Sequence, residues 1–483
     1  MREGSERHTM NRPREMPSTE KRPERAVDSL QQQLADYACN LRFEDLPPEV
    51  VHTAKLRVID TLGSLIGGFF AEPCRIARDV AAAMPNPAGA TVIGTRMKTS
   101  PEMAAYVNAA TARYVEMNDI YHWPGAFGGH PSDVLTPILA AAEHARVSGS
   151  DFITGVVLGY EVYQRFSDIF KNTGMGFDHT NFCTLGSAVA AAKMFGLDAQ
   201  KTAHAISMAA VPNVILRQVR ADHYSMYKAV ASGHAGRAGV FAALLARAGM
   251  EGPHLPFEGK AGWCSHVARD TLKLEGLGGR GTPFRIMEAL VKPRASCGTT
   301  ISSIMAAEKI APLRLSDVQK VTVEVYKKAK ERVGTGEHRW NPDTRETADH
   351  SIPYVVAATL LDGTVTPRSF NDARLWNPEL RALMHKIDVV ENEAFTKAYI
   401  KHPVEHHTRV TVLTKNGETL SGEAGGGEDD LSMPKSDTMI DEKFGTLCED
   451  RYGPKQVKRI LGQLWALDTL TNVAAIPPEF VIA

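Results

Sequence analysis

The chain has 483 residues, of which 43% are hydrophobic and 23% are charged, an ordinary globular composition over a length that exceeds one compact core. Its formal net charge of -1 provides no global field for attracting nucleic acid or an anionic membrane, so we expect neither as a partner. The six cysteines are scattered without a C-x-x-C pair, which argues against a structural zinc or an iron–sulfur cluster and fits a reducing cytosol. We therefore expect a cytoplasmic protein of two or three domains, without a metal or other cofactor, in which local cations hold any anionic ligand.

The first 26 residues are rich in Arg, Glu and Pro and lack the apolar run of a secretory signal. Organellar transit peptides are normally poor in acids, whereas this stretch contains five glutamates. We predict a disordered leader over residues 1–26. Along the rest of the chain, we expect no apolar stretch long enough to span a bilayer without polar interruption.

Residues 27–284 have a helical pattern. Pro47 and Pro48 stand where a helix start tolerates them, and apolar residues then recur at helical spacing. The stretches 151–166, 184–197 and 226–249 continue this pattern and are rich in Ala, Gly and Ser. Because small residues let helices approach closely, these segments predict a packed helical domain.

The pattern changes near Phe284. Residues 318–326 alternate apolar and polar side chains, as a half-buried strand does. Residues 409–424 have strand character on both sides of Asn416-Gly417, a strong hairpin signal. With helices expected at 299–311 and 350–361, this region predicts a smaller α+β domain with an antiparallel sheet.

A glycine-rich stretch, GGGEDD at 425–430, predicts a flexible linker after this domain. Beyond it, residues 441–452 and 454–467 are helical again. We expect these C-terminal helices to pack back onto the first helical block.

The segment 116–133, EMNDIYHWPGAFGGHPSD, is the first candidate for chemistry. His130 lies just before a helix for which Ser132 is the expected N-cap, and free N–H groups at a helix start favour a bound carboxylate. The helix dipole also lowers the proton affinity of an adjacent imidazole, which suits a neutral histidine. The alternative is that His130 only caps the helix. For the neighbouring His122, a position in a surface loop is the simpler interpretation.

Two further clusters lie in the helical region. His179 follows Asp178 at the start of a second small-residue helix, so a second imidazole lies near a second helix start. The stretch 217–237 contains Arg220 and Lys228. Lys228 enters a helix of Ala, Val, Ser and Gly, where a lysine either extends to solvent or faces a polar pocket.

The α+β region has two short motifs before predicted helices, KPRASCG with Lys292 and Cys297, and DHS with His350. Cys297 is a candidate nucleophile without an obvious base, and a structural thiol is an equal alternative. The stretch KHPVEHH at 401–407 holds three histidines. A metal site requires ligands on one face with a second shell, whereas in an extended run entering a strand we expect these histidines to be exposed.

Taken in chain order, these motifs resemble the MmgE/PrpD family, which includes 2-methylcitrate dehydratases, cis-aconitate decarboxylases and an epimerase of iminodisuccinate. The resemblance runs from about Leu46 to near the C-terminus. It is carried by HPSD, GYEV, DHT, LGSAVAAAKMFGLD, the Lys228 helix, FEG, KP and DHSIPYVVAATLLDG.

The resemblance implies a mainly α fold. A large all-helical domain is formed by N- and C-terminal segments, here 27–284 and 431–483, and a smaller α+β lid domain, here 285–430, is inserted between them. The resemblance also implies a homodimer without a metal and an active site between the domains.

By matching motif, the resemblance implies catalytic roles for His130, His179, Lys228 and Tyr354, the last as a lid tyrosine that acts in decarboxylating members. We expect the following residues to bind the substrate: Glu116, His122, Arg220, Lys292, Cys297 and His350. The sequence also departs from the family pattern, with Glu116 where Asp is usual and Cys297 where decarboxylating members have His. The cysteine argues against cis-aconitate decarboxylation.

The reaction that we predict is β-elimination of water from a small hydroxy-polycarboxylate. A neutral histidine removes the proton next to a carboxylate, Lys228 stabilises the developing charge, and Tyr354 or the second histidine protonates the departing hydroxyl. The sequence does not distinguish base from acid between His130 and His179. An epimerase or a decarboxylase shares the first step, and a non-catalytic binding homologue is the alternative from another class.

Overall fold

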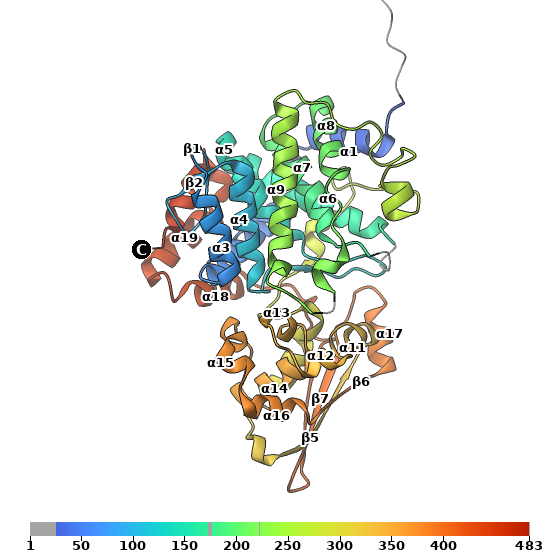
Figure 1. Ribbon diagram of the computed structural model, residues 1–483, viewed down its shortest axis with the longest axis vertical. Coiled ribbons are helices and arrows are strands. Elements are labelled where there is room, and N and C mark those ends of the chain that lie inside the picture. The colour runs from blue at the N-terminus through green and yellow to red at the C-terminus, as the bar shows by residue number, and fades with distance from the viewer. Residues whose placement is uncertain (1–25, 172–175, 222, 483) are drawn as a thin grey trace, which may run out of the picture.

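The computed structural model describes residues 26–171, 176–221 and 223–482 (Figure 1). The predicted leader over residues 1–26 lies outside the described residues, apart from Ala26. The described chain is mainly helical and has two large hydrophobic clusters. One cluster lies in a helical part and the other in a second part that holds a four-stranded sheet (yellow to orange in Figure 1).

The helical part begins with helices in the first half of the chain. They are α1 (Ser29–Asn40), α2 (Pro48–Gly68), α3 (Glu72–Ala82), α4 (Pro101–Tyr114), α5 (Leu135–Ala145), α6 (Gly149–Ile169), α7 (Thr180–Met194), α8 (Ala199–Ala210) and α9 (Tyr227–Arg247). The helices predicted after Pro48 and over 151–166, 184–197 and 226–249 are confirmed as α2, α6, α7 and α9.

Helix α9 packs against α4, α7 and α8 through its small residues. A Cβ on Gly233 would lie 2.5 Å from the Tyr106 carbonyl oxygen, and one on Gly239 would lie 2.6 Å from that of Thr184. Only glycine permits this approach of backbones, which confirms the predicted close packing. Helix α9 is long and apolar enough to cross a membrane by length and composition alone. It contains Lys228, His234 and Arg237, in line with the expected polar interruption, and 67% of its apolar window is buried inside the protein, as in a core helix.

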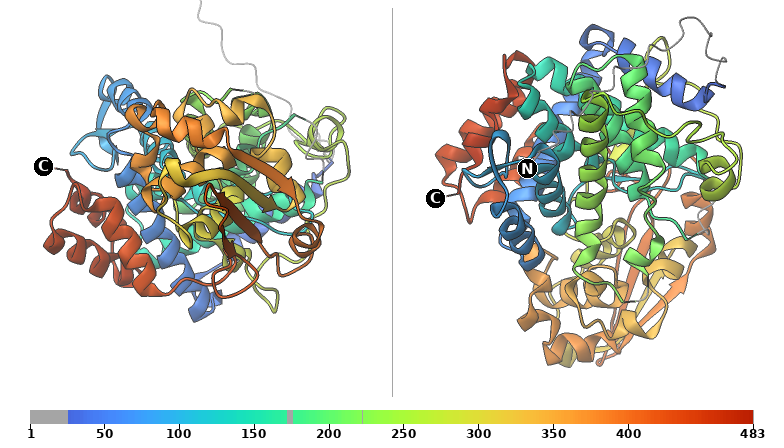
Figure 2. Two further views of the ribbon diagram at one scale, coloured as in Figure 1. Left: turned by 90° about the horizontal axis from the view of Figure 1, so that it is seen from below. Right: turned by 45° about the horizontal axis from the view of Figure 1, so that its top comes forward.

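The C-terminal helices α18 (Asp437–Cys448) and α19 (Pro454–Trp465) return to the helical part, as predicted. Phe444 is buried in the same hydrophobic cluster as α2. Lys443 pairs with Asp60 of α2 and donates from Nζ to the Met117 carbonyl oxygen at 2.7 Å. The red helices α18 and α19 therefore lie on the side of the helical part where α3 lies, opposite to α1 (Figure 1), and Figure 2 shows the same C-terminal helices from two further sides.

The second part is built on a sheet with the order β6 (Ile387–Glu391), β5 (Val318–Val325), β7 (Thr408–Thr414) and β8 (Thr419–Ala424). The β7–β8 hairpin turns at the predicted Asn416-Gly417 pair, where Gly417 has a φ of +88°. The prediction of a purely antiparallel sheet is wrong at one edge, because β5 and β6 are parallel. Helices intervene between these two strands, and such a crossover returns the chain in the same direction.

Short helices surround this sheet. They are α10 (Ile301–Glu308), α11 (Lys327–Val333), α12 (Glu337–Trp340), α13 (Arg345–Ala348), α14 (Ile352–Asp362), α15 (Asp372–Leu375), α16 (Pro378–Met384) and α17 (Glu393–Tyr399). Two of them, α10 and α14, confirm the helices predicted over 299–311 and 350–361. Helix α14 starts where Ser351 accepts a hydrogen bond from the Tyr354 N–H, as an N-cap does.

Two small antiparallel ladders were not predicted: β1 (Pro85–Thr91) with β2 (Lys98–Thr99), and β3 (Ile120–Tyr121) with β4 (Ala289–Leu290). These strands are too short to produce a recognisable alternation. The β3–β4 ladder matters for function because it joins the segment before His130 to the segment before Lys292.

The predicted flexible linker at 425–430 is wrong for Asp430, which is buried. The Asp430 carboxylate accepts hydrogen bonds from the backbone N–H groups of His406, Gly426 and Ser432 at 2.7 to 2.8 Å. The glycines therefore form a turn that is closed on a buried carboxylate.

Candidate active site

Glu116 is the centre of a buried polar cluster where the two parts meet. The side chain is 1% exposed and sits directly after α4 with a φ of +58°, a left-handed conformation that is uncommon for a residue other than glycine. It pairs with Arg113, with Lys228 Nζ at 3.2 Å and with Lys292 Nζ at 3.1 Å. Burial raises the pKa of Glu116, but Arg113, Lys228 and Lys292 together lower it well below its usual range, so the side chain is a carboxylate.

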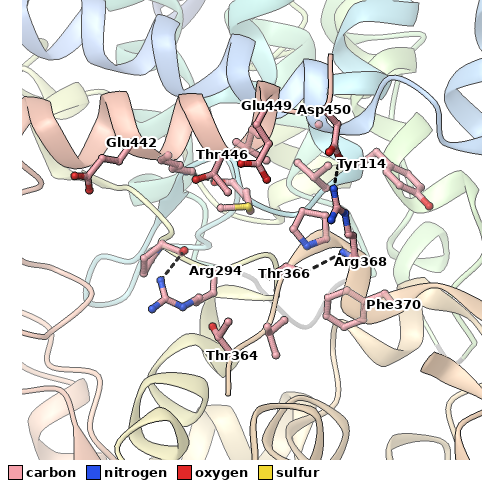
Figure 3. Close-up of a pocket in the computed structure, with 18 of the residues that line it drawn as sticks. Tyr114, Arg294, Thr364, Thr366, Arg368, Phe370, Glu442, Thr446, Glu449 and Asp450 are labelled. Atoms are coloured by element: carbon pink, nitrogen blue, oxygen red, sulfur yellow. Dashed lines mark hydrogen bonds and ion pairs between the residues drawn. The ribbon is translucent and has the colours of Figure 1, made fainter. Parts of the chain in front are cut away.

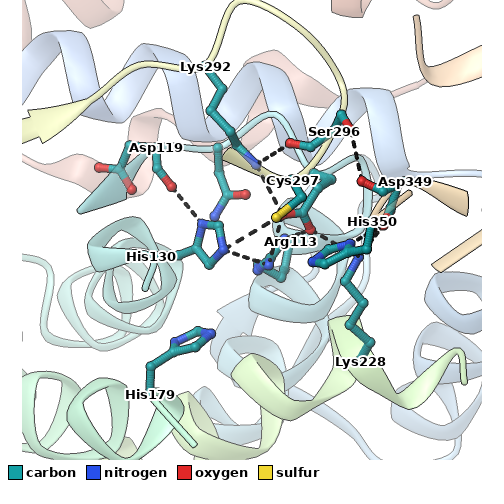
Figure 4. A network of polar contacts seen from close by, with 12 residues as sticks. Arg113, Asp119, His130, His179, Lys228, Lys292, Ser296, Cys297, Asp349 and His350 are labelled. Carbon is teal, nitrogen blue, oxygen red and sulfur yellow. Dashed lines mark hydrogen bonds and ion pairs between the residues drawn. The ribbon is translucent and has the colours of Figure 1, made fainter. Parts of the chain in front are cut away.

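Lys228, in the first turn of α9, faces this cluster and not solvent. Its Nζ lies 2.8 Å and 3.0 Å from the two carboxylate oxygens of Asp349, in addition to Glu116. Burial raises the pKa of Asp349, but Lys228 and His350 outweigh it and lower the value to about 2. The lysine thus joins a carboxylate of the helical part to one of the second part (Figure 4).

His130 and His179 lie next to each other, with ring centroids 5.4 Å apart (Figure 4). Both are buried, at 8% and 3% exposed. Burial lowers the pKa of each imidazole well below its usual value, and for His130 the charge of Arg113 adds to the effect. The structure therefore places two neutral imidazoles side by side.

Hydrogen bonds fix the tautomer of His130. Its Nδ1 donates to the Asp119 carbonyl oxygen at 2.7 Å, and its Nε2 accepts from Arg113 Nη2 at 2.8 Å, so the lone pair is on Nε2. The Tyr163 hydroxyl accepts from the His130 backbone N–H at 2.9 Å and lies 2.9 Å from His179 Nδ1. When this hydroxyl donates to Nδ1, His179 carries its proton on Nε2.

The turn that carries His130 differs from the expected helix cap. Residues Pro131–Val134 form a 3₁₀ turn ahead of α5, and the Ser132 N–H donates to Asp119 Oδ1 at 3.0 Å. Ser132 is therefore not the N-cap, because Asp119 takes that role from outside the helix. His130 makes no side-chain cap hydrogen bond, so the simple capping interpretation of His130 is also wrong.

Arg220 connects the starts of two helices. Its guanidinium pairs with Asp178, just before α7, and donates from Nη2 to the Lys228 carbonyl oxygen at 3.0 Å. Asp178 also accepts from the Thr180 hydroxyl at 2.7 Å. The structure brings Arg220 to the cluster, where its contacts hold His179 and Lys228 in position.

Cys297 and His350 enter the cluster from the second part. His350 Nδ1 lies 2.5 Å from Asp349 Oδ1 and 3.3 Å from Lys228 Nζ. Burial alone would raise the pKa of the Cys297 thiol, but the adjacent His350, aided by Arg332, lowers it to about 5. In return, Cys297 and Asp349 raise the pKa of His350 despite its burial, so the pair is a thiolate and an imidazolium.

His122 lies at one side of the cluster and contacts the histidine run of 401–407. His122 Nδ1 is 2.9 Å from His406 Nε2, and His406 Nδ1 is 3.0 Å from Asp430. The expectation that these histidines are exposed is wrong for His406, which is 1% exposed, and for the partly buried His407. In residues 26–171, 176–221 and 223–482, no group of three His, Cys, Asp or Glu side chains is arranged to hold a metal ion.

Tyr354 does not join the cluster. It is fully buried in the second part, where its hydroxyl donates to the Ser369 carbonyl oxygen at 2.7 Å and its ring stacks on Phe370. Burial raises the pKa of Tyr354.

A cavity of about 900 Å³ lies beside the cluster, between α18 and the second part (Figure 3). Tyr114, Arg294 and Arg368 are among the residues that line it. Arg345 separates the cavity from the cluster, since its Nη1 lies 2.8 Å from the Tyr114 carbonyl oxygen and 3.3 Å from Asp349 Oδ2. The cavity therefore borders the candidate site without containing its histidines.

Four residues of the cluster were not among the sequence candidates: Arg113, Asp119, Tyr163 and Asp349. Asp349 stands beside His350 in the DHS motif, and Arg113 stands three residues before Glu116, so their spacing carried a usable signal. Tyr163 lies on α6 and reaches His130 and His179 outside that helix, and Asp119 reaches His130 within the irregular segment 116–133, so helical spacing reveals neither contact.

The fold and the cluster define a mainly helical protein with a buried polar centre. Residues 32–275 match the MmgE/PrpD N-terminal domain and residues 295–467 match the MmgE/PrpD C-terminal domain, and the chain therefore belongs to the MmgE/PrpD family. This confirms the resemblance seen in the sequence motifs.

Curated relatives of this chain are similar along most of their length. A 2-methylcitrate dehydratase of Cupriavidus necator is 26% identical over 461 residues, covering 89% of this chain and 91% of the relative. One of Escherichia coli K12 is 27% identical, covering 79% and 81%. A human cis-aconitate decarboxylase is 24% identical, covering 86% and 87%. The names of these relatives denote two different reactions, dehydration and decarboxylation.

Proposed function

We propose that the protein is a metal-independent hydro-lyase that removes a proton next to a carboxylate and dehydrates a small hydroxy-polycarboxylic acid, like the relatives named 2-methylcitrate dehydratase. The observation that carries this proposal is the adjacent pair of neutral imidazoles, His130 and His179, beside buried lysines. Elimination of water requires one proton acceptor and one proton donor at neighbouring atoms. The tautomers of the two rings supply one of each.

In this mechanism, the lone pair on His130 Nε2 accepts the proton from carbon, and this new bond replaces the hydrogen bond from Arg113. Negative charge then develops on the adjacent carboxylate, and Lys228 and Lys292 stabilise it in a site shielded from water. The N–H on His179 Nε2 protonates the departing hydroxyl. Tyr354 is not required, because His179 serves as the acid.

We further propose that residues 285–430 act as a lid and that the protein works as a cytoplasmic homodimer. Support for the lid comes from the origin of the cluster. Asp349, His350 and Cys297 come from the second part, whereas Glu116 and Lys228 come from the helical part. A substrate bound among them requires both parts.

Epimerisation or decarboxylation is the second candidate. The human relative named cis-aconitate decarboxylase favours the latter, and two imidazoles beside one carbon would also serve an epimerase. Two features support dehydration over decarboxylation: Cys297 stands where decarboxylating members have histidine, and the Tyr354 hydroxyl is held by Ser369.

The decisive experiment incubates the protein in deuterated water with hydroxylated and unsaturated di- and tricarboxylates and follows each by NMR. Loss of water with deuterium at the carbon next to a carboxylate would support the proposal. Exchange without net product would instead indicate an epimerase, and release of carbon dioxide a decarboxylase. If the protein is folded but exchanges no proton of any substrate, the proposed proton abstraction is wrong, and so is the proposal that the protein is a hydro-lyase.

A further inference from the structure

The side of the cluster formed by α11 carries two cations that lack an acidic partner. Lys328 and Arg332 stand four residues apart on α11, so both project from the same face, and both are partly buried. In the described ranges, the only ion pair of α11 is between Lys327 and Glu331, which are exposed. Within the part of the chain that the structure describes, the buried Arg332 Nε has no hydrogen-bond partner.

These two cations face the active-site cluster. Helix α11 packs against the 3₁₀ turn Gly298–Thr300 that directly follows Cys297. The Lys328 ammonium lies 5.6 Å from the centre of the Tyr399 ring, and that ring contacts His122 edge-on. After burial and His406, the charges of Lys328 and Arg332 lower the pKa of His122. Both cations therefore act on the space between Cys297 and His122.

Two like charges held together in a partly buried place are unfavourable unless an anion compensates them. Burial and the charge of Arg332 lower the pKa of Lys328 to about 8, so the surroundings disfavour the charged form of this lysine. Cys297 acts to raise the pKa of both cations, and for Arg332 it and neighbouring groups together outweigh burial, but the same thiolate also acts on His350. Among the described residues, neither Lys328 nor Arg332 forms an ion pair with a carboxylate, so a ligand carboxylate would supply the missing partner.

We propose that Lys328 and Arg332 form a second carboxylate-binding site, which holds the substrate carboxylate remote from the carbon that loses its proton. This rests on the proposed function, because Lys228 and Lys292 are assigned to the carboxylate at the reacting carbon. The planar guanidinium of Arg332 suits bidentate recognition of a carboxylate. The site selects substrates with at least two carboxylates and places the selecting residues in the second part, whereas His130 and His179 belong to the helical part.

The test measures binding of tricarballylate, a saturated tricarboxylate without a hydroxyl group, by isothermal titration calorimetry. Wild type is compared with Lys328→Met, Arg332→Gln and the double variant, and with Lys327→Met, which removes an exposed charge from the same helix. We expect affinity to fall about 10- to 100-fold for each facing cation removed, as for a hydrogen bond to a charged group. Lys327→Met should bind within about twofold of wild type.

Turnover provides the second readout, with the substrate found in the deuterium experiment. The double variant should raise KM strongly while kcat falls much less, since the remote carboxylate is bound alike in the ground and transition states. The same loss should occur in a Cys297→Ser background, because a role limited to supporting the thiolate would vanish there. Arg332→Lys should recover part of the affinity.

Different failures separate the two proposals. A double variant that is folded by circular dichroism and keeps wild-type affinity and KM overturns the second carboxylate site and leaves the hydro-lyase intact. Wild-type protein that neither binds tricarballylate nor turns over any polycarboxylate overturns both.

Discussion

The two parts of the molecule differ in how completely their buried charged side chains form ion pairs. In the helical part, two buried carboxylates near the histidines are paired with cations: Glu116 with Arg113 and Lys228, and Asp178 with Arg220. In the second part, Lys328 and Arg332 stand without an acid. A satisfied network is rigid and suits proton transfer, whereas uncompensated charge suits a ligand that supplies the missing anion.

The largest effect is expected from the helical part. His130→Ala should lower turnover about 10²- to 10⁴-fold, because it removes the positioned proton acceptor. Unfolding by denaturant should show a stably folded protein, and His254→Ala, an exposed histidine far along the chain, should keep wild-type turnover. Full activity in His130→Ala would contradict the proposal that this histidine is the proton acceptor.

A substitution at the junction between the two parts should lower the unfolding free energy of the protein. Lys228→Met leaves Glu116 and Asp349 buried with less positive charge, which should cost about 3–5 kcal/mol of unfolding free energy in urea. The double variant Lys228→Met/Glu116→Gln should recover some of this loss, because one of the two carboxylates is then neutral. A Lys228→Met protein as stable as wild type would mean that the parts are not joined through this lysine.

A pH titration tests the charge state of the second part. The difference in absorbance at 240 nm between wild type and Cys297→Ser should appear with a midpoint near pH 5, since the pKa of this thiol is lowered to about 5 from 9.0. A depressed folded-state pKa stabilises the fold above the unfolded value, so the stability that Cys297 contributes should be lost as pH falls toward 5. A midpoint near pH 9 would contradict the thiolate–imidazolium pair.

The smallest effect is expected at Tyr354. Tyr354→Phe removes the hydrogen bond to the Ser369 carbonyl oxygen and should cost about 1 kcal/mol of unfolding free energy, with turnover unchanged. If turnover falls tenfold or more while the unfolding free energy stays within about 1 kcal/mol of wild type, the Tyr354 hydroxyl takes part in the reaction.

The sequence predicted the elements that have a repeating pattern or a clear turn signal, but only some of the contacts in the candidate site. Long helices such as α2 and α9 follow from repeating small and apolar residues, and the β7–β8 hairpin follows from Asn416-Gly417. Three predictions failed where a contact outside the local pattern decided the outcome. Asp119 caps the His130 turn, Asp430 closes the glycine turn, and β6 joins β5 in parallel after a helical crossover.

Short motifs at helix ends mark His130, His179, Lys228 and Glu116 in the sequence as candidates for the proposed chemistry. The charge state of each side chain depends on contacts that form only in the folded protein. Burial removes water, which favours the neutral form of both imidazoles, and contacts within the second part, between Cys297, His350 and Asp349, favour a thiolate beside an imidazolium. Cys297 and His350 are separated along the chain by α10, β5 and α11 to α13, so no local pattern encodes their contact.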